Sequence, residues 1–353
     1  MGIRAAIQKR LPGGFTLNIE FESQSERCLG ILGASGSGKS MTLKCVAGIE
    51  TPDSGIIEID GITVFDSSRR INVKPQRRET GYLFQNYALF PTMTVLENIR
   101  APLKDGRKAA EQAARLIARF GLEGLESRLP KTLSGGQQQR AALARMLIRK
   151  PRAVLLDEPF SALDENLREY MQLELAALLD ARSEGGVKNA VLVTHSRDEV
   201  FRLCPDLLML ESGRVIAAGK TREIFDNPKT LAAARLSGCK NISRVSVLSD
   251  YELYALDWGI KLRTEHKLDG VTHAGIRAHS FENGSAARHN TMKIKIKRKA
   301  ENPFEHTVIF TNAEAKAEGE RGELWWKYPA SKTGPLPDSL FFPAKHILPL
   351  SSN

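Results

Sequence analysis

Eight consecutive residues near the start of the sequence have the types and spacing needed to bind phosphate groups. They are Gly33, Ala34, Ser35, Gly36, Ser37, Gly38, Lys39 and Ser40. Glycines at this spacing let backbone N–H groups converge on phosphate oxygens, and a helix that follows them adds the positive end of its dipole. Lys39 would hold the β- and γ-phosphates, and the hydroxyl of Ser40 would bind Mg²⁺. The segment predicts a nucleotide site, to which we add the next residue, Met41.

Two adjacent carboxylates, Asp157 and Glu158, follow the apolar run 153–156. Such a run predicts a buried strand, which would bring Asp157 to the carboxyl end of a sheet, where it can hold magnesium through water. Glu158 would then polarise the attacking water as a general base. A strand followed by an acidic helix cap would explain one carboxylate, but not this pair downstream of a phosphate loop.

Periodicity predicts the elements that must position these residues. Continuous apolar runs are typical of central parallel strands, and apolar residues at helical spacing predict the helices between them. We expect strands at 27–32, 56–59, 62–65, 82–84, 153–157 and 190–194, and helices at 39–47, 110–118, 136–150 and 167–179. The fold class is therefore α/β, with a helical subdomain over about 90–150, in a first domain that spans 1–237.

The remaining residues, 238–353, have a different texture. Met292, Ile294 and Ile296 alternate with three lysines (Lys293, Lys295 and Lys297), and Gly, Pro and Asn residues recur between short runs of this kind. Alternation and frequent turn residues predict a small all-β domain with an OB-like barrel. We interpret the lysine row as a solvated face of that barrel rather than a nucleic-acid patch.

Length and composition set the outer limits. The chain has 353 residues, 42% of them hydrophobic, and a formal net charge of +10. Length and composition predict two ordinary globular domains. The charge admits nucleic acid, acidic lipid headgroups or anionic ligands as partners, but many soluble proteins carry such an excess, and we expect no nucleic-acid partner. The four cysteines are scattered and predict free structural thiols in a reduced compartment. No signal sequence is recognisable, and no apolar run reaches the roughly 20 residues needed to span a bilayer. We therefore expect any membrane role to depend on a partner.

A further segment opens the expected helix at 136–150. It consists of Leu133, Ser134, Gly135, Gly136 and Gln137. This segment resembles the signature of the ABC ATPase family, and the other motifs of that family follow in order. The resemblance implies that Gln85 senses Mg²⁺ and the attacking water, and that His195 contacts the γ-phosphate. It also identifies the segment Ser161-Ala162-Leu163-Asp164 as the D-loop.

The resemblance implies ATP and Mg²⁺ as cofactors, and a homodimer in which each ATP lies between two chains. The signature residues Ser134, Gly135, Gly136 and Gln137, with Asp164, would complete the nucleotide site of the opposite chain. The residues expected to act in catalysis are Glu158, His195, Gln85 and Lys39. Those expected to hold the metal are Ser40, Gln85 and Asp157.

One feature of the family is missing. An aromatic side chain usually stacks on adenine from the first β-hairpin, where this sequence has Arg10 and Phe15. Phe15 begins an alternating apolar stretch, and we interpret it as a core residue. Arg10 is the alternative contact for the base.

Two segments resemble importers within the family. Residues 86–99 resemble the stretch through which importer ATPases receive a coupling helix from separate membrane permease subunits, and a solute-binding protein would act with them. The run 275–279 resembles an element of importer regulatory domains, although Ala278 and His279 replace its Pro and Glu. These resemblances imply a peripheral protein on the cytoplasmic face of the cell membrane.

Only the overall likeness of the sequence to known importer ATPases indicates which solute is transported. The layout resembles molybdate or sulfate importer ATPases, with sugar, polyamine and iron(III) importers as alternatives. ABC ATPases of DNA repair are a poor fit, because only about fifty residues separate Gln85 from Ser134, too few for their long coiled coil. Translation-factor ATPases carry two cassettes in tandem, whereas this sequence has one phosphate loop.

Overall fold

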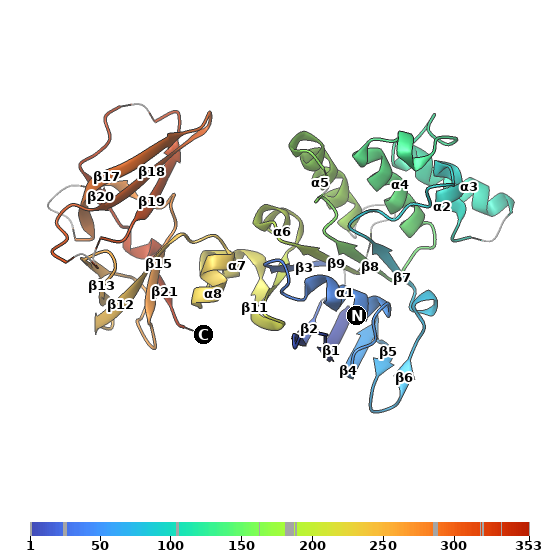
Figure 1. Cartoon of the computed structure of the whole chain (residues 1–353), viewed down its shortest axis with the longest axis horizontal. Helices are drawn as coiled ribbons and strands as arrows, with labels where there is room; N and C mark the ends of the chain where they lie inside the picture. Colours follow the sequence, from blue (N-terminus) through green and yellow to red (C-terminus); the bar gives the residue numbers. More distant parts are fainter. Residues whose placement is uncertain are drawn as a thin grey trace. The chain divides into compact units, whose positions relative to one another are not determined.

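The computed structural model describes residues 2–23, 27–103, 106–161, 163–180, 187, 189–284, 289–317, 319, 321–332 and 334–352. The chain divides into two compact units, Met1–Arg222 and Glu223–Asn353. In Figure 1 the first is mostly blue and green, and the second runs from yellow to red. The division comes before the expected boundary at 237/238. We therefore propose that the second domain begins at Glu223.

Among the described residues of the first unit, eleven strands form one sheet in the order β6-β5-β4-β1-β2-β11-β10-β3-β9-β8-β7. The strands are β1 (Ile3–Arg10), β2 (Thr16–Glu22), β3 (Arg27–Gly33), β4 (Ser54–Ile59), β5 (Ile62–Asp66), β6 (Ile71–Asn72), β7 (Thr80–Leu83), β8 (Ala153–Asp157), β9 (Asn189–Thr194), β10 (Asp206–Glu211) and β11 (Arg214–Lys220). The five strands β10, β3, β9, β8 and β7 are parallel to one another. Their carboxyl ends therefore share one edge, where ligands bind in open α/β sheets.

Helices connect and cover these strands (Figure 1). They are α1 (Lys39–Ala47), α2 (Val95–Arg100), α3 (Arg107–Arg119), α4 (Gly135–Leu147), α5 (Glu165–Leu179) and α6 (Arg197–Leu203), with 3₁₀ turns at Pro75–Arg77 and Pro130–Thr132. The expected end of α1 at Gly48 is confirmed, because this glycine adopts φ 78°, a left-handed conformation that suits a residue without a Cβ. The strands expected at 56–59 and 62–65 are confirmed as β4 and β5, which pair antiparallel as a hairpin.

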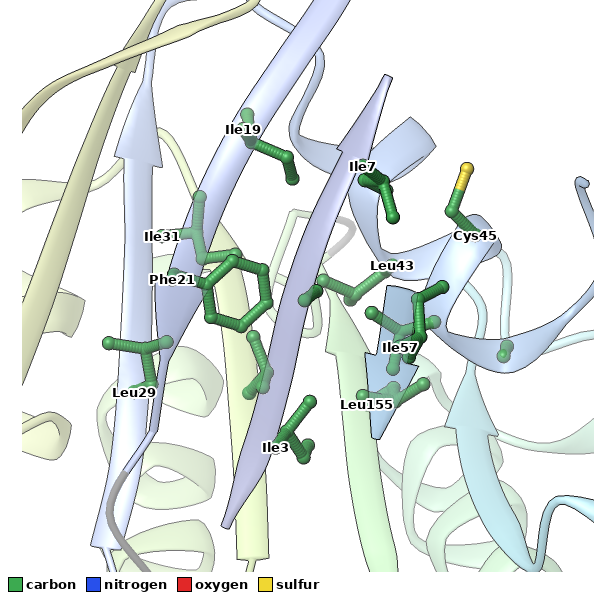
Figure 2. Close-up of a cluster of buried hydrophobic side chains, with 14 of the residues drawn as sticks. Ile3, Ile7, Ile19, Phe21, Leu29, Ile31, Leu43, Cys45, Ile57 and Leu155 are labelled. Carbon is green, nitrogen blue, oxygen red and sulfur yellow. The ribbon is translucent and has the colours of Figure 1, made fainter. Parts of the chain in front are cut away.

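The core of the first unit lies around β1, β2, β3 and α1, as Figure 2 shows. Every residue of β8 and of β9 is buried, as expected for central strands covered on both faces. All four cysteines are buried and free, so the expectation of structural thiols is confirmed; Cys45 is one of the core residues drawn in Figure 2.

The second unit is all-β apart from short helices, which confirms its fold class. Its strands are β12 (Asn241–Ser249), β13 (Glu252–Ala255), β14 (Ile260–Arg263), β15 (His273–Ile276), β16 (Glu282–Asn283), β17 (Thr291–Glu301), β18 (Glu305–Asn312), β19 (Leu324–Pro329), β20 (Ser339–Phe341) and β21 (Leu348–Leu350). They form two five-stranded sheets, β14-β13-β12-β15-β21 and β16-β20-β17-β18-β19. Buried side chains of both sheets belong to one core cluster, which includes Trp258, Trp326 and Phe342.

The short helix α8 (Leu231–Leu236) packs into the second unit and explains where the division falls. Ala234 of this helix and Cys239 share a small buried cluster with Leu348 and Leu350 of β21. Arg277 donates hydrogen bonds to the carbonyl oxygens of Phe225 and Ser237; α7 (Thr221–Asp226) contains the first of these acceptors. The segment before residue 238 therefore depends on the β-domain for its packing.

Strand β17 carries the lysine row. All three lysines are exposed, as expected for a solvated face, but Ile296 on the opposite side is also 42% exposed. A bulge between Ile296 and Arg298 changes the register with β18, and residues beyond a bulge lose the simple alternation of faces. Strand β20 pairs only with residues 291–293, so along 294–301 no described strand pairs with the second edge of β17.

Within the described ranges, no helix is both long enough and apolar enough to cross a membrane.

Candidate functional site

The phosphate loop follows β3 and runs directly into α1, so its backbone is fixed at both ends. Gly36 and Gly38 have φ angles of 79° and 104°, which residues with a Cβ adopt only with strain. The ammonium of Lys39 donates hydrogen bonds to the carbonyl oxygens of Gly33 and Ala34, both at 2.9 Å. The lysine thus lies folded across its own loop.

The loop has free donors for an anion. Helix α1 has no side-chain hydrogen bond at its N-cap, Gly38, and no acidic residue in its first turn. Among the described residues, the buried hydroxyl of Ser37 has no hydrogen-bond partner, and a Cβ at Gly36 would meet none of their atoms within 4 Å. An uncapped helix start with an unpartnered hydroxyl suits a phosphate group.

Burial lowers the pKa of Lys39, while the nearby charges of Glu158 and Asp157 raise it. The side chain is only 4% exposed. A buried ammonium needs compensating negative charge, which bound phosphates would add to that of the two carboxylates.

Asp157 ends β8 opposite the start of α1. Its Oδ1 accepts a hydrogen bond of 2.7 Å from the hydroxyl of Ser40, and its Oδ2 accepts one of 2.8 Å from the hydroxyl of Tyr82. Burial raises the pKa of Tyr82, and the Asp157 carboxylate raises it further. Tyr82 therefore stays a neutral donor that orients the carboxylate, a function that the sequence did not indicate.

The structure brings together the hydroxyl of Ser40 and the carboxylate of Asp157, two oxygen donors of the kind that suits Mg²⁺, which usually keeps several waters. The side chain of Gln85, the third expected ligand, contacts Glu158. In the described part of the chain, no three His, Cys, Asp or Glu residues lie close enough together to hold a metal.

Glu158 has a positive φ of 45°, and its N–H donates to the carbonyl oxygen of Val193 in β9 at 2.9 Å. Its Oε2 lies 3.3 Å from Nδ1 of His195 and 3.5 Å from Nε2 of Gln85. A left-handed backbone at a non-glycine residue is strained and clusters at functional sites. The structure therefore brings Gln85, Glu158 and His195 together at the carboxyl ends of β7, β8 and β9.

The signature residues lie at the start of α4. The Ser134 hydroxyl accepts a hydrogen bond from the N–H of Gln137, and the Gln137 side chain accepts one from the N–H of Ser134. Gly136 is packed so closely on Leu167 that a Cβ would come within 2.8 Å of it. In the part of the chain that the structure describes, no hydrogen bond joins Ser134, Gly135, Gly136 or Gln137 to the phosphate loop.

The D-loop residue Asp164 caps α5, accepting a hydrogen bond of 3.0 Å from the N–H of Leu167. The hydroxyl of Ser161 donates to the carbonyl oxygen of Glu158 at 3.0 Å. Ala162 lies outside the described residues. Met41, the last residue assigned to the nucleotide site, packs partly buried against the core beneath the loop.

The two candidates for an adenine contact lie in different surroundings. Phe15 packs against the core, as expected, but its ring also lies 3.4 Å from the position that a Cβ on Gly38 would occupy. The side chain of Arg10 is exposed, and its backbone N–H donates to Asp53. The ring at the mouth of the phosphate loop is therefore that of Phe15.

A groove of about 860 Å³ is lined by β7, by α4 and by the residues that directly follow α2 and α4. Part of the segment 86–99 lines it, including Ala88 and Phe90, and Phe90 is 46% exposed. Arg145 of α4 fixes this segment by donating to the carbonyl oxygens of Tyr87 and Ala88 at 3.0 and 2.8 Å.

Residues 16–161 match the family model described as "ABC transporter". The N-terminal unit has the ABC ATPase fold. The solved dimeric structure of the ATP-binding cassette MJ0796, described as a post-hydrolysis state bound to ADP and Pi, is similar to this chain. The TM-score is 0.53 at 28% identity, and the match covers 62% of this chain and 99% of that one.

Curated relatives share the name "Spermidine/putrescine import ATP-binding protein PotA". The protein from Acidothermus cellulolyticus is 42% identical over 219 residues, which cover 60% of this chain and 54% of the relative. That from Nitratidesulfovibrio vulgaris is 37% identical over 238 residues, which cover 66% of this chain and 62% of the relative. The chain thus spans between about half and three fifths of the length of these relatives. Their names do not support the expectation of molybdate or sulfate.

Proposed function

We propose that this chain is the ATP-hydrolysing subunit of an ABC importer. The observation that carries the proposal is the meeting of Gln85, Glu158 and His195 beside a phosphate loop that has free donors. These three groups come from the ends of three parallel strands, and side chains gathered at that edge can surround the terminal phosphate of a nucleotide.

The roles of the residues follow from this geometry. Lys39 would leave its loop carbonyls for the β- and γ-phosphates, because phosphate oxygens offer a charged acceptor instead of neutral ones. Ser40, Asp157 and Gln85 would hold Mg²⁺, which neutralises phosphate charge when bound. Tyr82 keeps Asp157 oriented through its hydrogen bond.

Glu158 would take a proton from the attacking water. Its carboxylate is mostly buried, with 17% of the side chain exposed, and it lies beside the largely exposed imidazole of His195. A base needs a fixed position within hydrogen-bond reach of the water. The hydrogen bond from the Glu158 N–H to β9 and the contact with Gln85 supply that position.

We also propose that two copies act together. The signature serine lies exposed at the start of α4, and this helix start would face the γ-phosphate held by another chain, where the helix dipole favours an anion. The related MJ0796 cassette is described as dimeric and bound to ADP and Pi.

The groove lined by Ala88 and Phe90 is the proposed contact with a membrane permease. Phe90 is nearly half exposed, and an exposed apolar side chain beside a cavity is typical of protein-binding sites. Through this contact the chain would lie on the cytoplasmic face of a membrane.

For the solute, the names of the relatives favour a polyamine such as spermidine or putrescine. Uptake of labelled spermidine and labelled molybdate, measured in cells with and without the gene, tests this choice. Loss of spermidine uptake alone is expected. Loss of molybdate uptake alone would restore the oxyanion hypothesis and refute the polyamine one.

The enzymatic part is tested with purified protein. Hydrolysis of ATP should require Mg²⁺ and should fall by about a hundredfold or more in Lys39→Ala, since the phosphates lose a fixed positive charge. Lys44→Ala, in the last turn of the same helix, is the matched control and should keep wild-type turnover. Equal turnover in wild type and Lys39→Ala would refute the proposed role of the loop.

A further inference from the structure

A strained turn contains Gln85 and the residues that follow it. Tyr87 and Ala88 are consecutive non-glycine residues with positive φ angles, of 59° and 44°. The N–H of Tyr87 donates to the carbonyl oxygen of Phe84 at 2.9 Å, which closes a four-residue turn with Gln85 as its second residue. A left-handed backbone at residues with a Cβ persists only where surrounding contacts enforce it. The position of Gln85 therefore depends on what holds Tyr87 and Ala88.

Tyr87 is at the centre of a second, tighter turn. The N–H of Ala88 donates to the carbonyl oxygen of Asn86 at 2.7 Å, and a three-residue turn with a positive φ at its middle residue is of the rare, strained kind. Tyr87 is 4% exposed, and its hydroxyl donates to the carbonyl oxygen of Pro159 at 3.5 Å. Pro159 directly follows Glu158. The strained turn thus lies against the segment that carries the proposed base.

The guanidinium of Arg145, in α4, holds both strained residues. Its Nη2 donates to the carbonyl oxygen of Tyr87 at 3.0 Å, and its Nη1 donates to that of Ala88 at 2.8 Å. Two hydrogen bonds from one planar group fix an orientation that a single donor on a flexible stem does not. The guanidinium carbon also lies 5.2 Å from the centre of the Phe90 ring, a distance at which a cation is attracted to an aromatic face.

Asn98, in α2, holds the far end of the same segment. This residue is fully buried, and its Oδ1 accepts a hydrogen bond of 2.8 Å from the N–H of Phe90. Its Nδ2 donates to the carbonyl oxygens of Phe90, Met93 and Thr94 at 3.1, 2.9 and 3.0 Å. The segment is thus fixed by β7 at its start and by Asn98 at its end, and Arg145 holds the residues between them.

We propose that Arg145 is a positioning residue for Gln85: its paired hydrogen bonds keep the turn in the left-handed conformation that presents the Gln85 side chain to Glu158. The Nε2 of Gln85 lies 3.5 Å from Oε2 of Glu158. This inference rests on the proposed ATPase function, in which both residues act beside the terminal phosphate. Arg145 acts at one remove, through the carbonyl oxygens of residues 87 and 88.

The first test measures kcat and the Kd for ATP in Arg145→Met, with Arg115→Met as the control. Arg115 is an exposed arginine in α3, so its variant should keep wild-type kcat. In Arg145→Met we expect kcat to fall by about 10- to 100-fold, as a small misplacement of a catalytic group does. The Kd for ATP should change by less than about threefold. Wild-type kcat in Arg145→Met would overturn the proposal.

Arg145→Lys serves the same test if Arg145→Met does not fold. Lysine keeps the positive charge but lacks the two paired donors of the guanidinium. We expect kcat to fall in Arg145→Lys as well, because the charge alone does not hold two carbonyl oxygens in place. Wild-type kcat in Arg145→Lys would overturn the proposal, since it would show that the paired hydrogen bonds are not needed.

A double-mutant cycle separates the positioning of Gln85 from a general effect on the fold. If Arg145 acts through Gln85, adding Arg145→Met or Arg145→Lys to Gln85→Ala should lower kcat by less than about threefold, because the side chain that Arg145 positions is already absent. A larger further fall would overturn the proposal. Amide hydrogen exchange in the full chain gives a readout that does not depend on activity. Exchange at Tyr87 and Ala88 should speed up in the Arg145 variants, and unchanged exchange there would also overturn the proposal.

Failure of the ATPase function itself would give a different result. If the wild-type protein shows no hydrolysis that depends on Lys39, the proposed function has failed, whatever the Arg145 variants do. If the wild-type protein hydrolyses ATP normally and Arg145→Met is unaffected, only this inference is refuted.

Discussion

Arg78 is a buried cation at the far end of α1, and its removal should destabilise the first unit. The side chain is 2% exposed and donates to the carbonyl oxygens of Cys45 and Val46 in the last turn of α1, at 2.8 and 2.9 Å, and to that of Val73 at 2.8 Å. It also donates to the side-chain oxygen of Asn72 at 3.1 Å. A cation at a helix C-terminus interacts favourably with the helix dipole.

The magnitude follows from the carbonyl groups that Arg78→Met would leave without donors. The carbonyl oxygen of Cys45 keeps a hydrogen bond from the N–H of Gly48, whereas Arg78 is the only donor seen for Val46 and Val73 within the described residues. An unsatisfied buried carbonyl costs about 1–3 kcal/mol. Two of them amount to about 2–6 kcal/mol, and we expect about 4 kcal/mol. With a urea slope of about 2–3 kcal/mol per molar, the urea midpoint should fall by about 1.3–2 M.

The assay uses the distribution of tryptophan between the two units. All three tryptophans, Trp258, Trp325 and Trp326, belong to the second unit, so their fluorescence follows that unit, whereas far-UV circular dichroism follows both. Arg78→Met should lower the urea midpoint of the transition followed by circular dichroism. It should leave the midpoint of the transition followed by tryptophan fluorescence unchanged. Arg77→Met, at the exposed neighbouring position, is the control. If the urea midpoints of Arg78→Met and Arg77→Met, followed by circular dichroism, agree within about 0.3 M, the reasoning is refuted.

Three further outcomes are expected. Glu158→Gln keeps the shape of the side chain but removes the base, so it should accumulate an Mg²⁺-ATP dimer in light scattering; a variant that stays monomeric at saturating ATP would argue against the two-chain site. Tyr82→Phe removes one donor to Asp157 and should raise the Mg²⁺ concentration for half-maximal turnover by about tenfold, as the loss of groups that orient metal ligands does; an unchanged Mg²⁺ dependence contradicts this role. Deletion of 223–353 should leave a folded cassette that hydrolyses ATP. The protein that lacks only 240–353 should aggregate more, because the buried face of α8 then becomes exposed. Equal solubility of the two shortened proteins would argue against the division at Glu223.

The sequence predicted those parts of the site in which neighbours along the chain act together. The phosphate loop between β3 and α1, and the pair Asp157 and Glu158 after β8, each depend on a local pattern that the structure reproduces as strand, loop and helix. Hydrophobic periodicity sets such elements, and parallel strands bring their carboxyl ends together.

Partners chosen by tertiary packing were not predictable in this way. Tyr82 and Asp157 are 75 residues apart in sequence, and nothing in either local pattern indicates the pairing. Arg78 is a charged residue in a polar segment, where burial is the exception. Its role appears only when the helices and strands around it are assembled.

The second unit shows the same limit for strands. Alternation correctly predicted β17, but not the bulge that leaves Ile296 exposed. A bulge inserts one residue on one strand only, so it depends on the pairing partner rather than on the strand's own sequence.

The open edge of β17 has a consequence for how the protein behaves at high concentration. Along 294–301 no described strand pairs with that edge, and isoleucines at 294 and 296 would make it a template on which another molecule could add a strand. The exposed Lys295, Lys297 and Lys299 resist this addition, because a second copy would bring the same charges against them. Neutralising these lysines by acetylation leaves the strand pairing in place and, among the described residues, breaks only the exposed ion pair between Lys299 and Glu301. It should make the domain precipitate through its edges.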